Sequence, residues 1–464
     1  MFSLRLNRLA FASLLLAFTQ LRGEEENLWP FYVRRTDPGI TSTQVAGPLF
    51  FRQTSAEGEQ QGLRPLYLDS VTAEGREGSF LYPFFTWRRQ EGYRTFSFFQ
   101  LINTRTDATR PGPADRHFDV WPFYFSRETG DPAESYHALF PVGGVIKNRF
   151  GRDRIAFTLF PLYAHTGKGG KQTTHAPWPF LRFISGEGHK GFEFWPLYGR
   201  TARAGDYERQ FALWPLFYKS ARNLSDPEPV VQVGALPFYT RDTGPGYLNE
   251  NYAWPFFGYS DRTTPYRYHE TRYFWPFLVQ GRGDDRRVNR WAPFYTHSVI
   301  KGYDKTWLAW PLFRRAEWQA DGLAQEKTTF LFFVWWSLEQ RSPDRPAAAA
   351  AHKTHLWPLY SAWDNGAGRR QVQALSPFEV FFPNNTTVRR LWTPLFALYR
   401  YDRQVDTTER HALLWDAVTW QRGPAGQEFH LGPLLSLRRK AGVRQWRLFL
   451  FDFPSKAAMK ASPP

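Results

Sequence analysis

The chain contains no cysteine and only 2 methionines among its 464 residues. The lack of cysteine excludes disulfide bonds, thiolate nucleophiles and thiolate metal sites. No internal stretch reaches the eighteen or so consecutive apolar residues that a membrane-spanning helix needs. The sequence also lacks a Gly-Lys-Ser or Gly-Lys-Thr phosphate loop, a Gly-x-Ser-x-Gly nucleophile elbow and a His-Glu-x-x-His pair. We therefore predict a non-enzymatic protein with no catalytic residues, no cofactor and no metal site.

Aromatic residues and proline are abundant, and they combine in a short motif that recurs along the chain. The motif reads [Trp/Leu/Phe]-Pro-[Leu/Phe]-[Tyr/Phe], as in residues 29–32, 195–198, 214–217 and 310–313. Successive copies mostly lie roughly 17 to 22 residues apart, and a fixed period of this size is typical of a repeat architecture. We therefore expect one core made of copies of a unit of about 19 residues.

The segments around the motif have the composition of β-strands. Runs such as 207–220 and 303–315 are rich in aromatic residues and have polar ends. Clusters of glycine, aspartate and asparagine separate the runs, at 203–206, 281–285, 364–368 and 422–426. Strands separated by such turns predict an all-β antiparallel meander. One strand of about twelve residues per period gives about 22–24 strands.

The proline in the motif needs a structural reason, because proline donates no hydrogen bond to a sheet. We interpret each motif as a bend or bulge within one long strand. Strand alternation then places Phe211 and Phe217 on one face, and Trp214 and Tyr218 on the other. Both faces are apolar for about eight residues, which at a tilt of about 40° rise roughly 20 Å, close to the apolar band of an outer-membrane strand.

Two architectures fit this strand pattern. The first is a large outer-membrane β-barrel, which agrees with many regular strands and abundant aromatic residues. Three features count against it: the linkers are uniformly short apart from Gln340 to His352, the lumen would be aromatic, and residues 454–464 follow the last strand. The alternative is a soluble β-solenoid or propeller-like repeat.

The N-terminal residues resemble a secretory signal peptide. Arg5 and Arg8 precede an apolar run from Leu9 to Phe18, which is too short to cross a membrane. We predict a signal peptide over 1–23, a single repetitive β domain over 24–454 and a disordered tail over 455–464. A signal peptide predicts export, and an exported chain without cysteine is typical of a bacterial envelope protein. We therefore expect the outer membrane of a Gram-negative bacterium, with the periplasm or the cell surface as the alternative location.

The formal net charge is +16, and basic residues are spread over nearly every repeat. They have two interpretations, as solvated turn residues or as an attraction for anionic lipid headgroups and polymers. We expect the lipid bilayer with its anionic headgroups as a partner, polysaccharide as a further one, and no nucleic acid.

The predicted function follows from location and architecture. It is that of an outer-membrane β-barrel with a channel, transport or envelope-structural role. The alternative is a soluble periplasmic or surface repeat protein that binds polysaccharide or protein partners through exposed aromatic residues.

Two histidine pairs are candidate binding sites. His165 and His175 flank the basic glycine loop 166–171, which predicts either a phosphate cradle or a flexible hairpin. No helix begins after this loop, so we favour the hairpin. His352 and His355 would share a face as metal ligands on a helix, but a disordered loop explains them better.

Other departures from the repeat carry weaker signals. Asp284 and Asp285 resemble a carboxylate pair, yet their turn context favours solvated charges. Residues 384–387 contain glycosylation sequons. Some repeats depart from the motif and carry unusual tryptophans, and these are candidates for a specialised role: Trp335, Trp336, Trp415 and Trp420.

Overall fold

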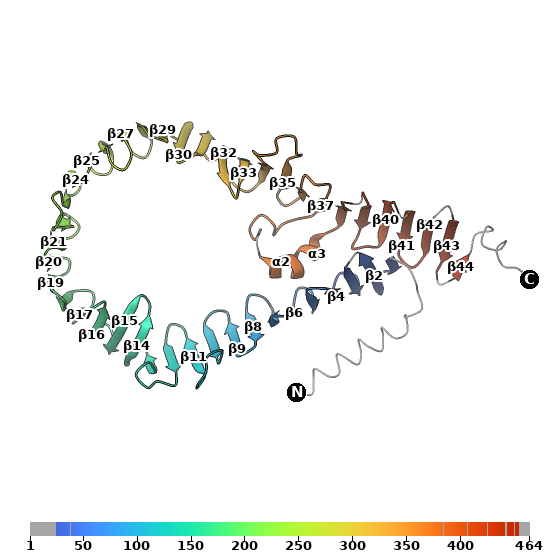
Figure 1. The fold of residues 1–464 in the computed structure, drawn as a ribbon, viewed down its shortest axis with the longest axis horizontal. Helices are drawn as coiled ribbons and strands as arrows, with labels where there is room; N and C mark the ends of the chain where they lie inside the picture. Colours follow the sequence, from blue (N-terminus) through green and yellow to red (C-terminus); the bar gives the residue numbers. More distant parts are fainter. Residues whose placement is uncertain are drawn as a thin grey trace, which may run out of the picture. The chain divides into compact units, whose positions relative to one another are not determined.

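The computed structural model describes residues 25–37, 39–383, 385–405, 407–424, 426–440, 443–449 and 451–453. The predicted signal peptide (1–23) and tail (455–464) lie outside them. The described residues form 44 strands and two short helices, α2 (Thr386–Leu391) and α3 (Thr393–Phe396). The strands belong to one antiparallel sheet in which they follow each other in sequence order (Figure 1). The prediction of an all-β antiparallel meander is confirmed.

The chain divides into two compact units, which are described separately. Unit 2 spans 84–356 and contains these strands: β8 (Phe85–Gln90), β9 (Tyr93–Phe98), β10 (Ile102–Asp107), β11 (Asp115–Val120), β12 (Tyr124–Glu128), β13 (Tyr136–Leu139), β14 (Gly143–Arg149), β15 (Arg152–Thr158), β16 (Tyr163–Lys168), β17 (Lys171–His175), β18 (Leu181–Ser185), β19 (His189–Phe194), β20 (Tyr198–Arg203), β21 (Tyr207–Ala212), β22 (Phe217–Arg222), β23 (Val230–Ala235), β24 (Tyr239–Gly244), β25 (Tyr247–Tyr252), β26 (Phe257–Arg262), β27 (Tyr268–Phe274), β28 (Leu278–Gly283), β29 (Arg286–Trp291), β30 (Tyr295–Ile300), β31 (Tyr303–Leu308), β32 (Phe313–Ala320), β33 (Leu323–Phe330), β34 (Trp335–Arg341) and β35 (Ala351–Leu356).

Unit 1 combines residues up to 83 with those from 357 onward. Besides the two helices it contains these strands: β1 (Glu25–Leu28), β2 (Tyr32–Asp37), β3 (Ile40–Val45), β4 (Phe50–Ser55), β5 (Gly58–Leu63), β6 (Tyr67–Thr72), β7 (Gly75–Phe80), β36 (Tyr360–Asp364), β37 (Arg370–Ala374), β38 (Tyr399–Arg403), β39 (Glu409–Leu413), β40 (Val418–Gly423), β41 (Gly426–Leu431), β42 (Leu435–Lys440), β43 (Val443–Leu448) and β44 (Phe451–Phe453).

The predicted strand length was wrong, because the chain reverses at the aromatic-proline motif instead of bending there. Each predicted strand of about twelve residues is a hairpin of two strands of about six, so about 22–24 strands become 44. Phe211 pairs with Tyr218 and Ala212 pairs with Phe217 across such a reversal. Phe211 and Tyr218 therefore share a face, contrary to the expected alternation. The reversal also halves the apolar length that was estimated from eight consecutive residues.

The predicted closure into a barrel is not found. Every strand pairing described in the structure joins neighbours in the sequence. Closure requires the first strand to pair with the last, and among the described residues β1 pairs with β2 whereas β44 pairs with β43. The sheet is therefore an open meander.

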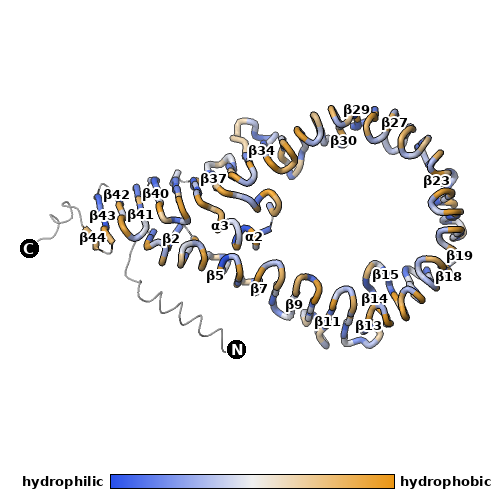
Figure 2. The backbone as a smooth tube through the Cα atoms, turned by 180° about the vertical axis from the view of Figure 1, so that it is seen from behind, coloured by the Kyte–Doolittle hydropathy of each residue, from blue (hydrophilic) through white to orange (hydrophobic). Residues whose placement is uncertain are grey.

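The two edges of the meander differ in chemistry, because strand direction alternates and every motif that closes a hairpin falls on the same edge. In unit 2 the turns at this edge, which we call the apolar rim, are 99–101, 121–123, 140–142, 159–162, 176–180, 195–197, 213–216, 236–238, 253–256, 275–277, 292–294, 309–312 and 331–334. The opposite edge carries polar turns, including the predicted clusters at 203–206 and 281–285. Apolar and polar segments alternate along the chain in Figure 2.

Unit 2 has a small core on one face of its sheet. Phe125, Tyr136, Ile146 and Phe157 are buried there together with two alanines. In unit 1, Leu391 of α2 is fully buried against Phe51 and Leu68 of the N-terminal strands. The helices were not predicted; they occupy the long connection between β37 and β38, where two copies of the motif lose their turn geometry.

We expect Phe157→Ala to loosen the middle of unit 2, because it removes a ring that is only 6% exposed from the core. A buried phenylalanine cut to alanine costs about 3–5 kcal/mol. Hydrogen exchange of peptides covering β14–β16 should accelerate. The control Phe192→Ala removes a ring that is 42% exposed and should leave exchange in the same region unchanged. Equal protection in both variants would contradict the assigned core.

Candidate functional site

The backbone of the apolar rim is hydrogen-bonded from one turn to the next. In the turn 213–216, the N–H of Leu213 donates to the carbonyl of Leu197 at 2.7 Å, and the N–H of Trp214 donates to Pro196 at 2.6 Å. The N–H of Leu216 donates back to Leu213 at 2.8 Å, and proline has no N–H. Every backbone donor of this turn is therefore satisfied without water.

The same arrangement recurs along unit 2. The turn 309–312 makes the equivalent bonds, with Ala309 donating to Phe294, Trp310 to Pro293 and Leu312 to Ala309. Proline therefore suits this position because it removes the donor that the turn could not pair. The turns 159–162, 213–216 and 309–312 can consequently leave water without the cost of unpaired backbone N–H groups.

The side chains of the rim are apolar and exposed. Phe238 and Phe294 are 75% and 77% exposed, and leucines and tryptophans of other rim turns are about half exposed. Monomeric soluble proteins rarely expose contiguous apolar surface on this scale. The rim is therefore the most prominent candidate for an interaction surface among the described residues.

A row of cations lies next to the rim on one face of unit 2. Tyr198, Phe217, Tyr239 and Phe313 open the strands that leave the rim, and two positions further along stand Arg200, Lys219, Arg241 and Arg315. The pairing partners connect these cations in one line across the sheet, so they share a face. All four are exposed. In each of these strands the aromatic residue lies next to the rim and the cation lies two residues further away. The surface therefore changes from apolar to basic with increasing distance from the rim.

The row also contains an acidic position, Glu250. Its carboxylate accepts hydrogen bonds from Tyr239 at 2.9 Å, Tyr252 at 3.0 Å and Tyr259 at 2.7 Å. The hydrogen bond from Tyr259 is the largest influence on the pKa of Glu250, which lies below its ordinary value despite desolvation. Glu250 also pairs with Arg241 at 3.4 Å. Arg200 and Arg315 pair with Glu208 and Glu326 at 2.8 and 2.9 Å, so carboxylates offset part of the positive charge of the row.

Unit 1 holds a second candidate site, a buried polar cluster between its N-terminal and C-terminal strands, which lie side by side (Figure 1). Arg410 binds both carboxylate oxygens of Glu25, at 2.9 and 3.1 Å. Thr419 donates to Glu25 at 2.8 Å, and Arg410 also binds Asp416 at 2.8 Å. Arg438 donates to the backbone carbonyl of Glu25. The side chains of Glu25 and Arg410 are 2% and 8% exposed.

The electrostatics of the cluster fit a structural ion pair, which we call the clamp, better than a pair of groups that exchange protons. Burial alone would raise the pKa of Glu25, but the charge and hydrogen bonds of Arg410, helped by His430 and Thr419, lower it to about 2. Burial opposes the charge of Arg410, yet Glu25 and Asp416 raise the pKa of its guanidinium. Both groups stay ionised near neutral pH, so neither exchanges protons there.

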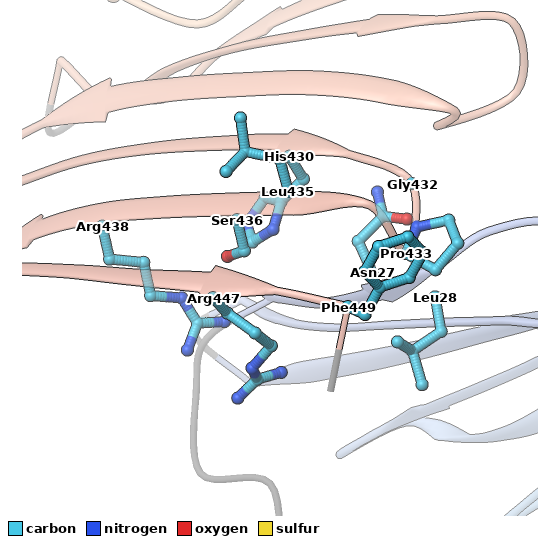
Figure 3. A pocket seen from close by; sticks show the side chains of 10 residues that line it. All are labelled: Asn27, Leu28, His430, Gly432, Pro433, Leu435, Ser436, Arg438, Arg447 and Phe449. Carbon is cyan, nitrogen blue, oxygen red and sulfur yellow. The ribbon is translucent and has the colours of Figure 1, made fainter. Parts of the chain in front are cut away.

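A small cavity lies beside this cluster (Figure 3). Its walls include Asn27 from the N-terminal strand and His430, Ser436, Arg438 and Arg447 from the C-terminal strands. The volume is about 10 Å³, which is about the space of one water molecule. The cavity is therefore too small for an organic substrate.

The structure places the first histidine pair on a β-hairpin, as favoured from the sequence. His165 lies on β16 and bonds Thr174 and Gln172, at 2.9 Å each. His175 lies on β17 opposite Ala164, so the two histidines are on different faces of the sheet. They do not form one site.

The second pair is also separated. His352 and His355 lie on β35, where positions i and i+3 face opposite sides, so the helical interpretation was wrong. The disordered-loop alternative does not hold either, because both residues belong to a strand. His355 is fully buried and lies 4.3 Å from the ring of Trp336. Asp284 and Asp285 lie in the predicted turn, where Asp284 accepts the N–H of Arg267.

The other residues that depart from the repeat pattern make structural contacts. Asn385 caps α2 by accepting the N–H of Val388 at 3.0 Å, whereas Asn384 lies outside the described residues. Trp415 donates to the carbonyl of Leu395, and Trp420 stacks on His411 at 4.5 Å between ring centres.

Within the described part of the chain, no helix is long and apolar enough to cross a membrane. There too, no group of three or more histidine and acidic residues is arranged to hold a metal ion. Comparison of the sequence with protein-family models and with curated proteins found no match.

The sequence reasoning missed the Glu25 cluster, because its partners lie 385 and 394 residues away along the chain. The only local signal was the acidic run that follows the predicted cleavage site. No periodicity links that run to the arginines of the last repeats.

We expect Glu25→Gln to destabilise unit 1 by about 3 kcal/mol, because it leaves a buried arginine with one partner fewer. The folded-state pKa of Glu25 is depressed to about 2, so its stabilising contribution is complete above the ordinary value of 4.5 and is lost as the pH falls from there toward 2. Hydrogen exchange of β1 and β39 at several pH values measures this, and the variant should lack the acid-dependent step.

The exposed pair Arg52–Glu59 in the same unit provides the control. Glu59→Gln should cost less than about 1 kcal/mol. If the two variants changed exchange equally, the clamp would have no special role.

Proposed function

We propose that this chain is a non-enzymatic structural protein of the cell envelope that inserts its apolar rim into one leaflet of a lipid bilayer. The supporting observation is the combination of exposed apolar side chains with backbone donors that are bonded from turn to turn, as in 159–162, 213–216 and 309–312. Irregular backbone enters hydrocarbon only when its polar groups are satisfied internally. An ordinary protein-binding patch does not require that pairing, so the turn-to-turn bonds favour lipid.

The depth of the rim suits one leaflet. A rim turn and, in most repeats, the adjoining residue of each flanking strand are apolar, which at about 3.3 Å per strand residue gives an apolar layer of about 7 Å. The hydrocarbon core of a bilayer is about 30 Å thick, so the layer does not span it. Interfacial proteins bury their apolar faces by about 5–10 Å.

The placement of the basic residues suits an anionic membrane surface, although Arg200, Arg241 and Arg315 also pair with carboxylates and so contribute less than free cations. The four cations of the row next to the rim would lie at headgroup level when the rim is inserted, with the aromatic residues just below them. Tyrosine and tryptophan favour this boundary, and each basic residue near an anionic surface contributes about 1 kcal/mol.

We further propose the outer membrane of a Gram-negative bacterium as the location, with the periplasm or the cell surface as the alternative. This location depends on the predicted signal peptide and the absence of cysteine. A channel role is not proposed, because a lumen requires the closure that the meander lacks. Binding of polysaccharide by the exposed aromatic residues is the competing function, and it predicts binding to glycan in the absence of lipid.

We expect the purified protein to float with phosphatidylglycerol–phosphatidylethanolamine vesicles and the double variant Phe238→Ser/Phe294→Ser to bind at least tenfold more weakly. These rings are among the most exposed of the rim. Each phenylalanine transferred into an apolar environment contributes about 1.5–3 kcal/mol. Vesicle flotation with lipid titration measures the change.

The matched control changes two exposed apolar residues near the polar edge, Leu224→Ser/Ile300→Ser. It should bind as the wild type does. If wild-type protein failed to float but was retained on a polysaccharide column, the competing function would replace this one.

We also expect Arg200→Gln/Lys219→Gln/Arg241→Gln to weaken binding to anionic vesicles at low salt, by up to about 1 kcal/mol per residue. The difference from wild type should shrink at high salt, because salt screens surface charge. With vesicles of neutral lipid the two proteins should bind alike. A variant that lost binding equally to both kinds of vesicle would argue against the headgroup contact.

A further inference from the structure

An apolar groove crosses one face of unit 2, between β11 and β18. Its volume is about 350 Å³, within the range of small-molecule sites. The walls are formed by Phe125, Phe140, Phe157 and Phe160, and two tryptophans stand at its ends, Trp121 and Trp178. Of the described residues that line it, only Thr166 and His175 carry polar side chains.

Three of the lining residues, Phe125, Phe157 and Ala164, belong to one row of strand residues. Phe125, Ala138, Gly144, Phe157 and Ala164 are successive pairing partners across five strands, so they form one row on one face. A β-carbon at Gly144 would lie 2.7 Å from that of Ala138, so the backbones approach too closely for a larger residue. The two phenylalanines stand on either side of the small residues and bound the groove.

The groove opens at the apolar rim. Trp121, Phe140, Phe160 and Trp178 belong to four successive rim turns. Phe160 lies 5.2 Å from Phe140 and 5.5 Å from Trp178 between ring centres. At the other edge of the sheet the groove reaches Phe150. The guanidinium of Arg149 lies there, 5.1 Å and 5.0 Å from the ring centres of Phe125 and Phe150. The groove thus runs from the apolar edge to a cation.

The polar groups of the walls carry no charge near neutral pH. Burial, followed by the charges of Arg182 and Arg152, lowers the pKa of His175 below its ordinary value. Thr166 is uncharged, and the Arg149 charge is balanced by Asp119 through two contacts of 2.7 Å. An apolar chain therefore meets no unpaired charge inside the groove.

We infer that this groove binds one acyl chain of a bilayer phospholipid. The inference rests on the proposed insertion of the rim, since the rim turns at the mouth would then lie in hydrocarbon. A lipid standing beside the sheet has its chain ends at the depth of the rim and its headgroup further from it. Its chain would occupy the part of the groove next to the rim, lined by Trp121, Phe140, Phe160 and Trp178, with the headgroup at the level of the cation row.

The test uses the full-length protein bound to phosphatidylglycerol–phosphatidylethanolamine vesicles that contain a trace of phosphatidylglycerol with a photoactivatable diazirine on one acyl chain. After irradiation, mass spectrometry maps the cross-links. We expect them to concentrate in peptides covering 121–178. Ala164→Phe, which fills the floor of the groove, should reduce these cross-links at least fivefold. Thr166→Phe fills it at a half-buried position and provides a second variant if the first disturbs folding.

The matched control is Ala156→Phe, on the neighbouring strand β15 but facing away from the groove. It should keep the wild-type cross-links, and all three variants should float with vesicles as the wild type does. Cross-links spread evenly over the rim turns, or unaffected by both filling variants while flotation persists, would overturn the groove alone. Failure of wild-type protein to bind vesicles would overturn both the groove and the proposed function.

Discussion

Backbone hydrogen bonding through the aromatic-proline turns is the constraint on which the rest of the sheet depends. In most antiparallel sheets the ladder ends where the strands end, and the turn groups are left to water. Here the ladder continues through the turns, so residues 213 and 214 bond to 197 and 196 as strand residues would. The proline contributes by lacking a donor. As a result the apolar side chains gather on one edge, and in turns such as 213–216 and 309–312 each backbone N–H beside them is hydrogen-bonded.

The two units differ in how much of the apolar surface of their strands is buried. In unit 1 the N-terminal strand β1 lies against β39, β40 and β42, and the buried Glu25–Arg410 pair fixes which residues meet. Such a pair adds specificity more readily than net stability, because desolvation offsets much of the attraction. In unit 2 the faces have only a small core, and large apolar side chains remain exposed. The apolar side chains of the unit 2 rim therefore stay exposed, whereas unit 1 supplies part of its own cover.

The sequence predicted the class of fold, the meander and the polar turns, because these depend on local composition and period. It failed at the proline: a strand broken by a bulge and a hairpin closed by a turn have the same period, and only the pairing of Phe211 with Tyr218 distinguishes them. The error doubled the apparent apolar length and led to a barrel. The basic residues were noted in the sequence, but their alignment in one row follows from strand register. The Glu25 cluster required contacts across nearly the whole chain.

The repeat also determines the length of the apolar rim. Each hairpin adds two strands, and with about 4.8 Å between neighbouring strands it lengthens the rim by about 10 Å. Because each rim turn bonds only to the turns before and after it, a hairpin can be gained or lost without altering the geometry of distant ones. The length of the apolar edge is therefore a count of repeats, which duplication or deletion of about nineteen residues changes one step at a time.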